Sequence, residues 1–154
     1  MSQLPAILHV FNDRQTCVQA LSAALVAQLQ AVLQVNSRAR LLLPGGSGPQ
    51  LLLPVLANAA VDWSRVELSA TDERWVPAQD VASNWRLLQQ GLPQALCLDP
   101  RQGSTPELAA QAWGAQLSRW LPLDAVLLGM GEDGHFASLF SQMPGLPAAL
   151  DPDC

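Results

Sequence analysis

Lysine is absent from this chain of 154 residues, so all eight basic side chains are arginines. With 13 Asp and Glu residues, the formal net charge is −5. Nonspecific binding to nucleic acid or to an anionic membrane requires a basic face, which an acidic chain lacks. We therefore expect neither partner, and we expect any anionic ligand to be held by arginine, by backbone amides, or by both.

Cysteine and histidine are also scarce. The three cysteines, Cys17, Cys97 and Cys154, are odd in number and widely spaced, without a C-x-x-C pair. This pattern is typical of reduced thiols in the cytoplasm, not of a disulfide framework. The two histidines, His9 and His135, have no second His or Cys at metal-ligand spacing, so we expect no metal site.

Targeting and membrane segments are missing from the pattern as well. The N-terminal residues lack the basic region and long apolar core of a signal peptide. Proline, glycine or glutamine interrupts each leucine-rich stretch before it reaches the length of a membrane span. There is no internal repeat or low-complexity linker, while 49% of the residues are hydrophobic. We expect a cytoplasmic protein with one α/β domain, residues 1–154.

Aliphatic runs alternate with helical patterns along the chain. The predicted strands are residues 6–11, 41–43, 65–70 and 124–129. The predicted helices are residues 13–32, 50–60 (kinked or delayed by Pro54), 84–92 capped by Ser83, 106–120 capped by Thr105, and one that begins with HFASLF at 135–140. This alternation predicts a doubly wound, Rossmann-like domain of three layers, in which helices cover both faces of a parallel sheet.

Three unusual loops follow predicted strands: PGGSGP at 44–49, TDERWVP at 71–77 and GMGEDGH at 129–135. Ligands of doubly wound sheets collect at the carboxyl ends of the strands. We therefore expect these loops to meet in space although they lie far apart in the sequence.

The first two loops each have two interpretations. Gly45 and Gly46 allow the backbone to approach an anion at the start of the next helix, and Ser47 offers a hydroxyl donor. The loop lacks the GK[ST] of a Walker A motif and the GxGxxG pattern, and an ordinary strand-to-helix turn accounts for the same residues. In the second loop, Arg74 can hold phosphate through two donors, whereas an exposed charged loop is the alternative.

The third loop gives the clearest indication of chemistry. His135 follows Glu132 and Asp133 and precedes the predicted helix 135–140. The helix dipole disfavours imidazolium while the carboxylates favour it, and the sequence leaves open which prevails. A neutral histidine can act as a general base. Because there is no GxSxG elbow, and Ser138 is assigned to helix packing, water activated by His135 is preferred to a hydrolytic triad. His9, within strand 6–11, is assigned a structural role.

Together the three loops resemble those of the 6-phosphogluconolactonases, within a larger group that includes the glucosamine-6-phosphate deaminases. LLLPGGSGP, the stretch from TDERWVP to SNW, and LLGMGEDGHFASLF are similar to family motifs and keep their order over nearly the whole chain. Gly48 and Phe136 stand where the family usually has threonine, and Ser141 follows LF where proline is usual.

The resemblance implies a function and a set of site residues. It implies that His135 activates water, that Asp133 helps to orient the site, and that Gly45, Gly46, Ser47 and Arg74 hold a phosphorylated substrate. The implied reaction is hydrolysis of 6-phospho-D-glucono-1,5-lactone to 6-phosphogluconate, in the oxidative pentose phosphate pathway, without a metal or organic cofactor. The implied partner is thus a small phosphorylated sugar lactone.

Members of the group generally continue beyond the length of this chain. We therefore expect the N-terminal portion of such a fold, with the last strands and helices missing. We also expect weak or absent activity of this chain alone, and self-association through an exposed sheet edge. Two alternatives remain open: a deaminase of the same group, and a noncatalytic phosphosugar-binding fragment.

Overall fold

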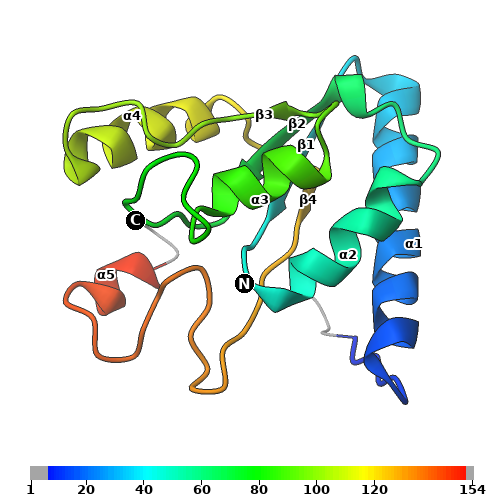
Figure 1. Ribbon diagram of the computed structural model, residues 1–154, viewed down its shortest axis with the longest axis horizontal. Coiled ribbons are helices and arrows are strands. Elements are labelled where there is room, and N and C mark those ends of the chain that lie inside the picture. Colours follow the sequence, from blue (N-terminus) through cyan, green and yellow to red (C-terminus); the bar gives the residue numbers. More distant parts are fainter. Residues whose placement is uncertain (1–6, 152–154) are drawn as a thin grey trace.

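The computed structural model describes residues 7–151. In chain order its elements are α1 (Arg14–Val35), β1 (Ala39–Leu43), α2 (Ser47–Ala57), the 3-10 helix η1 (Trp63–Arg65), β2 (Val66–Ala70), α3 (Asn84–Gly91), β3 (Leu96–Cys97), α4 (Pro106–Ser118), β4 (Ala125–Val126) and α5 (Leu146–Ala149). Figure 1 shows the sheet between the helices, with the strands β1 and β4 running toward the loop that follows β4.

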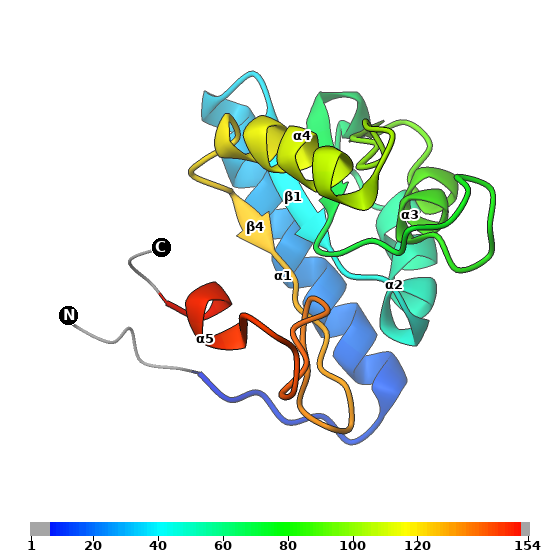
Figure 2. The same cartoon turned by 90° about the vertical axis from the view of Figure 1, so that its left-hand side faces the viewer.

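The four strands form one sheet in the order β3-β2-β1-β4, and every neighbouring pair is parallel. The chain steps from β1 to β2 to β3 in one direction and then returns through α4 to β4, on the other side of β1. Because such crossovers are right-handed, this reversal places α4 on the opposite face from α2 and α3. Figure 2 shows α4 in front of the sheet and α1 behind it. The doubly wound α/β prediction is confirmed.

The core lies between β1, β2 and the helices of one face. In both central strands the side chains of positions one, three, four and five are buried, as expected for strands covered on both faces. Helix α1 is long and apolar enough to cross a membrane by length and composition alone. Leu25 and Leu29 on one side of it are buried in the core, and further apolar residues of the helix are partly buried against the core: Val18, Leu21, Val26, Val32 and Leu33. On the other face, the Trp113 indole of α4 donates to the Ser69 hydroxyl of β2 at 3.0 Å.

Helix α2 begins earlier than predicted, within the glycine-rich loop. Ser47 is its first residue, and Pro49 is tolerated because the first-turn amides have no partner inside a helix. The helix runs through Pro54 to Ala57, since Leu52 and Leu56 bury its inner face. Proline therefore neither delays nor ends this helix, because burial of the apolar face outweighs the lost backbone bond.

The predicted strand 6–11 is wrong over its described residues, 7–11. These residues are extended without strand pairing, and Ile7, Leu8 and Val10 are 78%, 87% and 82% exposed. A strand requires a neighbouring ladder, and none of the described strands pairs with this segment. His9 is accordingly exposed, with its ring stacked on Phe11 at 6.5 Å instead of being held inside a sheet.

The predicted helix at 135–140 is also wrong. This segment folds into tight turns in which Ala137 and Ser138 have φ values of 46° and 61°. Left-handed residues interrupt a right-handed helix, so the HFASLF pattern cannot continue as one. The amide of Leu139 instead donates to the Phe136 carbonyl at 2.8 Å. Strand β4 is shorter than predicted, and β3 was not predicted because its two residues carry too little pattern.

Candidate functional site

Backbone hydrogen bonds hold the three loops at one edge of the sheet. The Thr71 amide, at the start of the loop after β2, donates to the Leu43 carbonyl at 3.0 Å. The Leu127 amide, after β4, donates to the Leu42 carbonyl at 3.0 Å. A cavity of about 520 Å³ lies between the loops, at the carboxyl end of β1 where the chain reverses direction. Ligand sites of doubly wound sheets occupy this position.

Five of the six predicted site residues line this cavity: Gly45, Gly46, Ser47, Arg74 and His135. The sixth, Asp133, lies behind the His135 ring and contacts it. We call the first four residues the glycine–arginine end of the cavity, and His135 with Asp133 the histidine end. Glu132 is exposed and does not line the cavity. Of the two carboxylates that precede His135, Asp133 is the one that contacts its ring.

At the glycine–arginine end, the start of α2 opens into the cavity. Gly46 precedes the helix with φ 92° and ψ −167°, a combination that is essentially restricted to glycine. No side chain caps this helix, and Gly46, Ser47 and Gly48 are exposed. The unpaired amides of a helix N-terminus attract anions through their N–H groups and the helix dipole.

Arg74 places a guanidinium beside these amides. Its Nη1 atom donates to Asn84 Oδ1 at 2.5 Å and to the Ala82 carbonyl at 3.0 Å. Its other guanidinium nitrogens form no hydrogen bond with residues 7–151, and the residue is exposed. One nitrogen is therefore fixed by the protein, while the others can bind an anion.

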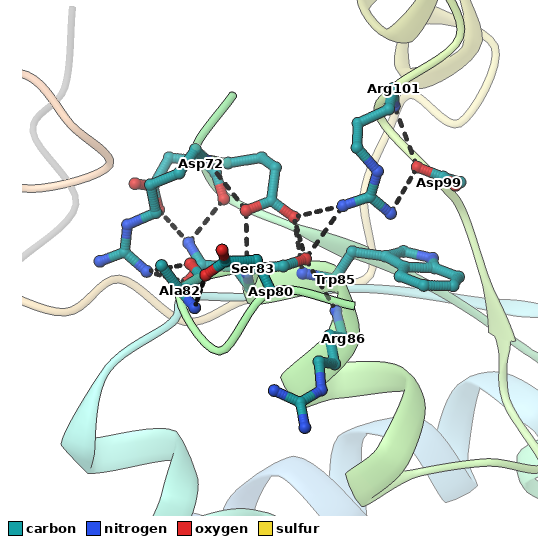
Figure 3. Close-up of polar contacts among 11 residues, drawn as sticks. Asp72, Asp80, Ala82, Ser83, Trp85, Arg86, Asp99 and Arg101 are labelled. Atoms are coloured by element: carbon teal, nitrogen blue, oxygen red, sulfur yellow. Dashed lines mark hydrogen bonds and ion pairs between the residues drawn. The ribbon is translucent and has the colours of Figure 1, made fainter. Parts of the chain in front are cut away.

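Beneath Arg74, the buried carboxylate of Glu73 organises the loop. Its side chain is 5% exposed and accepts hydrogen bonds from five groups: the amides of Arg74, Asn84 and Trp85, the Ser83 hydroxyl and the Arg101 guanidinium. Figure 3 shows Arg101 reaching both Ser83 and Asp99. Arg101 also lies over the Trp85 ring, 4.7 Å from its centroid. This carboxylate thus fixes the loop that carries Arg74.

At the histidine end, the ring of His135 pairs with a single carboxylate. Its Nδ1 atom lies 2.5 Å from Asp133 Oδ1, and the ring stacks on Phe140 at 4.3 Å. The hydrogen bond from the His135 ring holds the pKa of the Asp133 carboxyl below its usual value. Nε2 forms no hydrogen bond with the described residues, which leaves this nitrogen able to exchange a proton with a molecule in the cavity.

The local backbone decides one question that the sequence left open. Because residues 135–140 form turns and not a helix, no helix dipole acts on His135 from that side. Asp133 is therefore the charge that acts on the ring at close range.

Sequence reasoning missed several residues that line the cavity. Arg14 at the start of α1 supplies a second guanidinium, and Asp72 and Asn84 come from the second loop and its helix. Ser138, assigned to helix packing, instead donates its hydroxyl to Asp72 and so joins the second loop to the third. Adjacency to Arg74 in TDERW was a signal for Asp72, whereas no pattern pointed to Arg14.

A metal centre is not formed by the described part of the chain. Within residues 7–151, no group of three or more His, Cys, Asp or Glu side chains is arranged to hold a metal ion. The side chains and amides that line the cavity offer proton exchange at His135 and anion binding at the start of α2 and at Arg74.

Comparison with known proteins gives consistent results. The family model described as glucosamine-6-phosphate isomerases/6-phosphogluconolactonase matches residues 12–153. The 6-phosphogluconolactonase of Pseudomonas aeruginosa is 35% identical over 152 residues, which cover 94% of this chain and 64% of the relative. That of Rhizobium meliloti is 37% identical over 156 residues, which cover 97% of this chain and 67% of the relative. The chain thus spans about two thirds of the length of these relatives.

Solved structures show the same architecture. The crystal structure of a 6-phosphogluconolactonase from Shewanella baltica matches with a TM-score of 0.85 and 35% identity, over 92% of this chain and 64% of that one. The structure of 6-phosphogluconolactonase from Trypanosoma brucei matches with a TM-score of 0.73 and 26% identity, over 89% and 64%. The family model and the relatives cover most of this chain, the solved structures share its fold, and the chain belongs to the glucosamine-6-phosphate isomerase/6-phosphogluconolactonase family.

Proposed function

We propose that this cavity hydrolyses 6-phospho-D-glucono-1,5-lactone to 6-phosphogluconate, the reaction of the oxidative pentose phosphate pathway. One observation carries the proposal: His135, whose ring is paired with Asp133, lines the same cavity as the anion-binding glycine–arginine end. A phosphorylated lactone needs both, one for its phosphate and one for its ester. The relatives named 6-phosphogluconolactonase support the same assignment.

Each end has a role in the proposed reaction. The amides at the start of α2, the Ser47 hydroxyl and Arg74 bind the phosphate, because each is an exposed donor that lines the cavity. At the other end, Nε2 of His135 removes a proton from water while Nδ1 donates to Asp133. The Asp133 carboxylate stabilises the imidazolium that forms, and it holds the ring in position.

The bond changes follow from this arrangement. The water oxygen attacks C1 of the lactone, and the carbonyl electron pair moves onto its oxygen. When the carbonyl re-forms, the bond between C1 and the ring oxygen breaks, and the proton held by His135 passes to that ring oxygen. The products are a carboxylic acid, which then loses its proton to solvent, and a hydroxyl, and the histidine returns to its neutral form. Since a lactone is a reactive ester, one general base suffices without a covalent nucleophile.

The test is lactone hydrolysis, corrected for the spontaneous rate, by this chain and by a form extended at its C-terminus. His135→Ala should lower kcat by about 10²- to 10⁴-fold in whichever form is active, because a general base contributes about that much. Phosphate binding should be retained, since the proposed phosphate-binding groups are the α2 amides, Ser47 and Arg74, and not His135. Glu132→Ala is the matched control, because that carboxylate is exposed outside the cavity.

Three results would contradict the proposal. Undiminished hydrolysis by His135→Ala would remove the histidine from the mechanism. Release of ammonia from glucosamine 6-phosphate, without lactone hydrolysis, would favour a deaminase instead. If phosphate binds but neither substrate reacts in either form, a noncatalytic phosphosugar-binding role is left.

We also propose that this chain, acting in the cytoplasm, self-associates through the β4 edge. Among the described strands β4 pairs only with β1, so its other edge is open. Val126, Leu128 and Met130 on this segment are 46%, 50% and 82% exposed. Open edges with apolar side chains promote pairing between chains.

Analytical sedimentation tests this proposal. Val126→Lys should shift the protein toward the monomer, whereas Val81→Lys in an exposed loop should not. A wild-type chain that is monomeric at all concentrations would refute the self-association.

A further inference from the structure

Asn84 is a buried polar residue to which the proposed reaction assigns no role. It is the first residue of α3, and it is 2% exposed although it borders the cavity. Its Nδ2 atom donates to the Asp72 carbonyl at 2.9 Å, and its Oδ1 atom accepts from Arg74 Nη1 at 2.5 Å. Both polar atoms of the amide are therefore used within the second loop, and their use fixes which way the amide faces.

The same side chain also lies against the glycine-rich loop. A Cβ atom on Gly45 would lie 1.8 Å from Asn84 Oδ1 and 2.3 Å from its Cγ, far inside any permitted contact. The three atoms that such a Cβ would meet first all belong to Asn84. Gly45 has no left-handed φ that would require glycine on its own account. Glycine at this position therefore makes room for the amide of Asn84.

We propose that Asn84 is a positioning residue that sets the distance between Arg74 and the N-terminus of α2, so that both grip one phosphate group. Arg74 belongs to the loop after β2, and the α2 amides belong to the loop after β1. Among the described contacts, Asn84 alone both hydrogen-bonds Arg74 and packs on Gly45. The inference rests on the proposed function and deepens it, since it names the residue that keeps the two parts of the glycine–arginine end at a fixed distance from each other.

The physical argument concerns preorganisation. A free arginine side chain loses rotamer freedom when it binds an anion, and this loss weakens binding. Arg74 has one nitrogen already held by Asn84 and Ala82, while its remaining donors face solvent. Part of the loss of rotamer freedom of the Arg74 side chain thus occurs on folding and not on binding. Without Asn84, the guanidinium and the helix amides would vary in their separation.

The first test is a double-mutant cycle read by calorimetric binding of inorganic phosphate to this chain. Asn84→Ala should weaken phosphate binding about tenfold, the effect of losing one hydrogen bond to a charged group. In an Arg74→Ala background the same change should have little further effect, because Asn84 acts through Arg74. Equal losses in the two backgrounds, or no phosphate binding by the unmodified chain, would overturn the proposal.

The second test examines the contact with Gly45. Gly45→Ala should strongly reduce stability in urea unfolding, whereas Gly45→Ala combined with Asn84→Ala should lose much less than the sum, because the methyl group then occupies vacated space. Additive losses would show that Asn84 is not what excludes a side chain at position 45. Gly48→Ala is the control, since a Cβ there meets nothing within 4 Å.

A conservative variant separates positioning from simple structural support. Asn84→Asp keeps the shape and the oxygen that accepts from Arg74 but loses the donor to the Asp72 carbonyl. It should therefore be less stable than the unmodified chain and yet bind phosphate more tightly than Asn84→Ala. Phosphate affinity that follows stability in all variants would reduce Asn84 to a structural residue.

Failure of this proposal can be distinguished from failure of the proposed function. Phosphate binding does not require turnover, so the expected cycle without lactone hydrolysis would refute the reaction and leave the role of Asn84 intact. Where the lactone is turned over, Asn84→Ala should raise KM more than it lowers kcat, because it loosens binding at the end remote from the reacting bond. A fall in kcat with unchanged KM would contradict the positioning role.

Discussion

The two ends of the cavity use carboxylates in opposite ways. At the glycine–arginine end, Glu73 is 5% exposed and accepts five hydrogen bonds, including one from Arg101. At the histidine end, the Asp133 side chain is 63% exposed and has His135 as its partner. Both carboxylates lie in loops that follow a parallel strand, Glu73 after β2 and Asp133 after β4, so backbone topology does not explain the difference.

Burial and partner number explain it. A buried, fully bonded carboxylate holds a loop in one shape, because releasing any donor leaves an unpaired polar group. An exposed carboxylate with one ring partner adds little to stability, but it leaves the ring free to gain and lose a proton. The first arrangement suits the binding of a fixed charge, and the second suits proton transfer. Four predictions test this contrast, in decreasing order of their expected effect on stability.

The largest loss is expected from Glu73→Ala. It removes the carboxylate shared by the amides of α3 and by Arg101, whose side chain is only 12% exposed. Breaking a buried pair in this way costs about 3–5 kcal/mol. Urea unfolding measures the loss, and Glu132→Ala at the exposed position is the control. If Glu73→Ala lost no more stability than Glu132→Ala, Glu73 would contribute as little as an exposed carboxylate, and the contrast between the two ends would be wrong.

A smaller loss is expected from Gly46→Ala. The φ of 92° and ψ of −167° at this position strain any residue with a side chain by about 1–3 kcal/mol. Phosphate binding should weaken at the same time, because the amides at the start of α2 would shift. Chemical unfolding and calorimetry measure the two effects. Gly48→Ala, at the second residue of the helix, should be neutral or slightly stabilising, since alanine favours helix. Equal effects of the two changes would contradict the conformational argument.

The thiol of Cys97 in β3 is acted on by the charges of Asp99, Arg101 and Glu73, and its effect on stability should appear only in alkali. Burial, and then the charge of Asp99, raises the pKa of this thiol to about 12, from an ordinary value of 9.0. The folded state therefore binds the proton more tightly than the unfolded state. The resulting contribution to stability is complete below pH 9 and is lost between pH 9 and about 12. Unfolding free energies over this range should fall less steeply for Cys97→Ala; parallel curves would refute the shift.

The smallest effect on stability is expected from Asp133→Asn, together with a clear effect on turnover. The pKa of Asp133 is lowered by the His135 hydrogen bond, so its carboxylate stays charged as the pH falls toward the usual carboxyl range. The contribution of this carboxylate to folding stability is lost only below that range. Loss of activity between pH 7 and 5 must therefore come from another group. We expect kcat to fall by about 10- to 10⁴-fold with unfolding unchanged. If Asp133→Asn reduced stability without reducing kcat, Asp133 would have the structural role that we assign to Glu73.

Much of the fold followed from local pattern. Ser83 and Thr105 cap helices where the sequence predicted them. The first helix also begins near its predicted start, with Asp13 as the N-cap that accepts from the Thr16 amide and hydroxyl. The aliphatic runs at 41–43 and 65–70 became the central strands. These features are readable because capping and continuous apolar burial depend on neighbouring residues.

The failures share a cause. The apolar run at 6–11 has the composition of a strand, yet its described residues have no neighbouring strand to pair with. HFASLF has helical composition, but the chain turns there through the left-handed Ala137 and Ser138. Strand pairing and turn geometry depend on distant groups, which composition does not encode.

By itself, the sequence determined the alternation of strands and helices, the placement of three loops at the strand ends, and the chemical types available there: glycine, arginine, carboxylate and imidazole. Only the tertiary structure decided which of these groups meet. It buried Glu73 and Asn84 while leaving Asp133 exposed, and it brought Ser138 to Asp72. The reason is that burial and side-chain pairing are properties of surfaces brought together by folding, whereas a sequence pattern records only the order of residues along the chain.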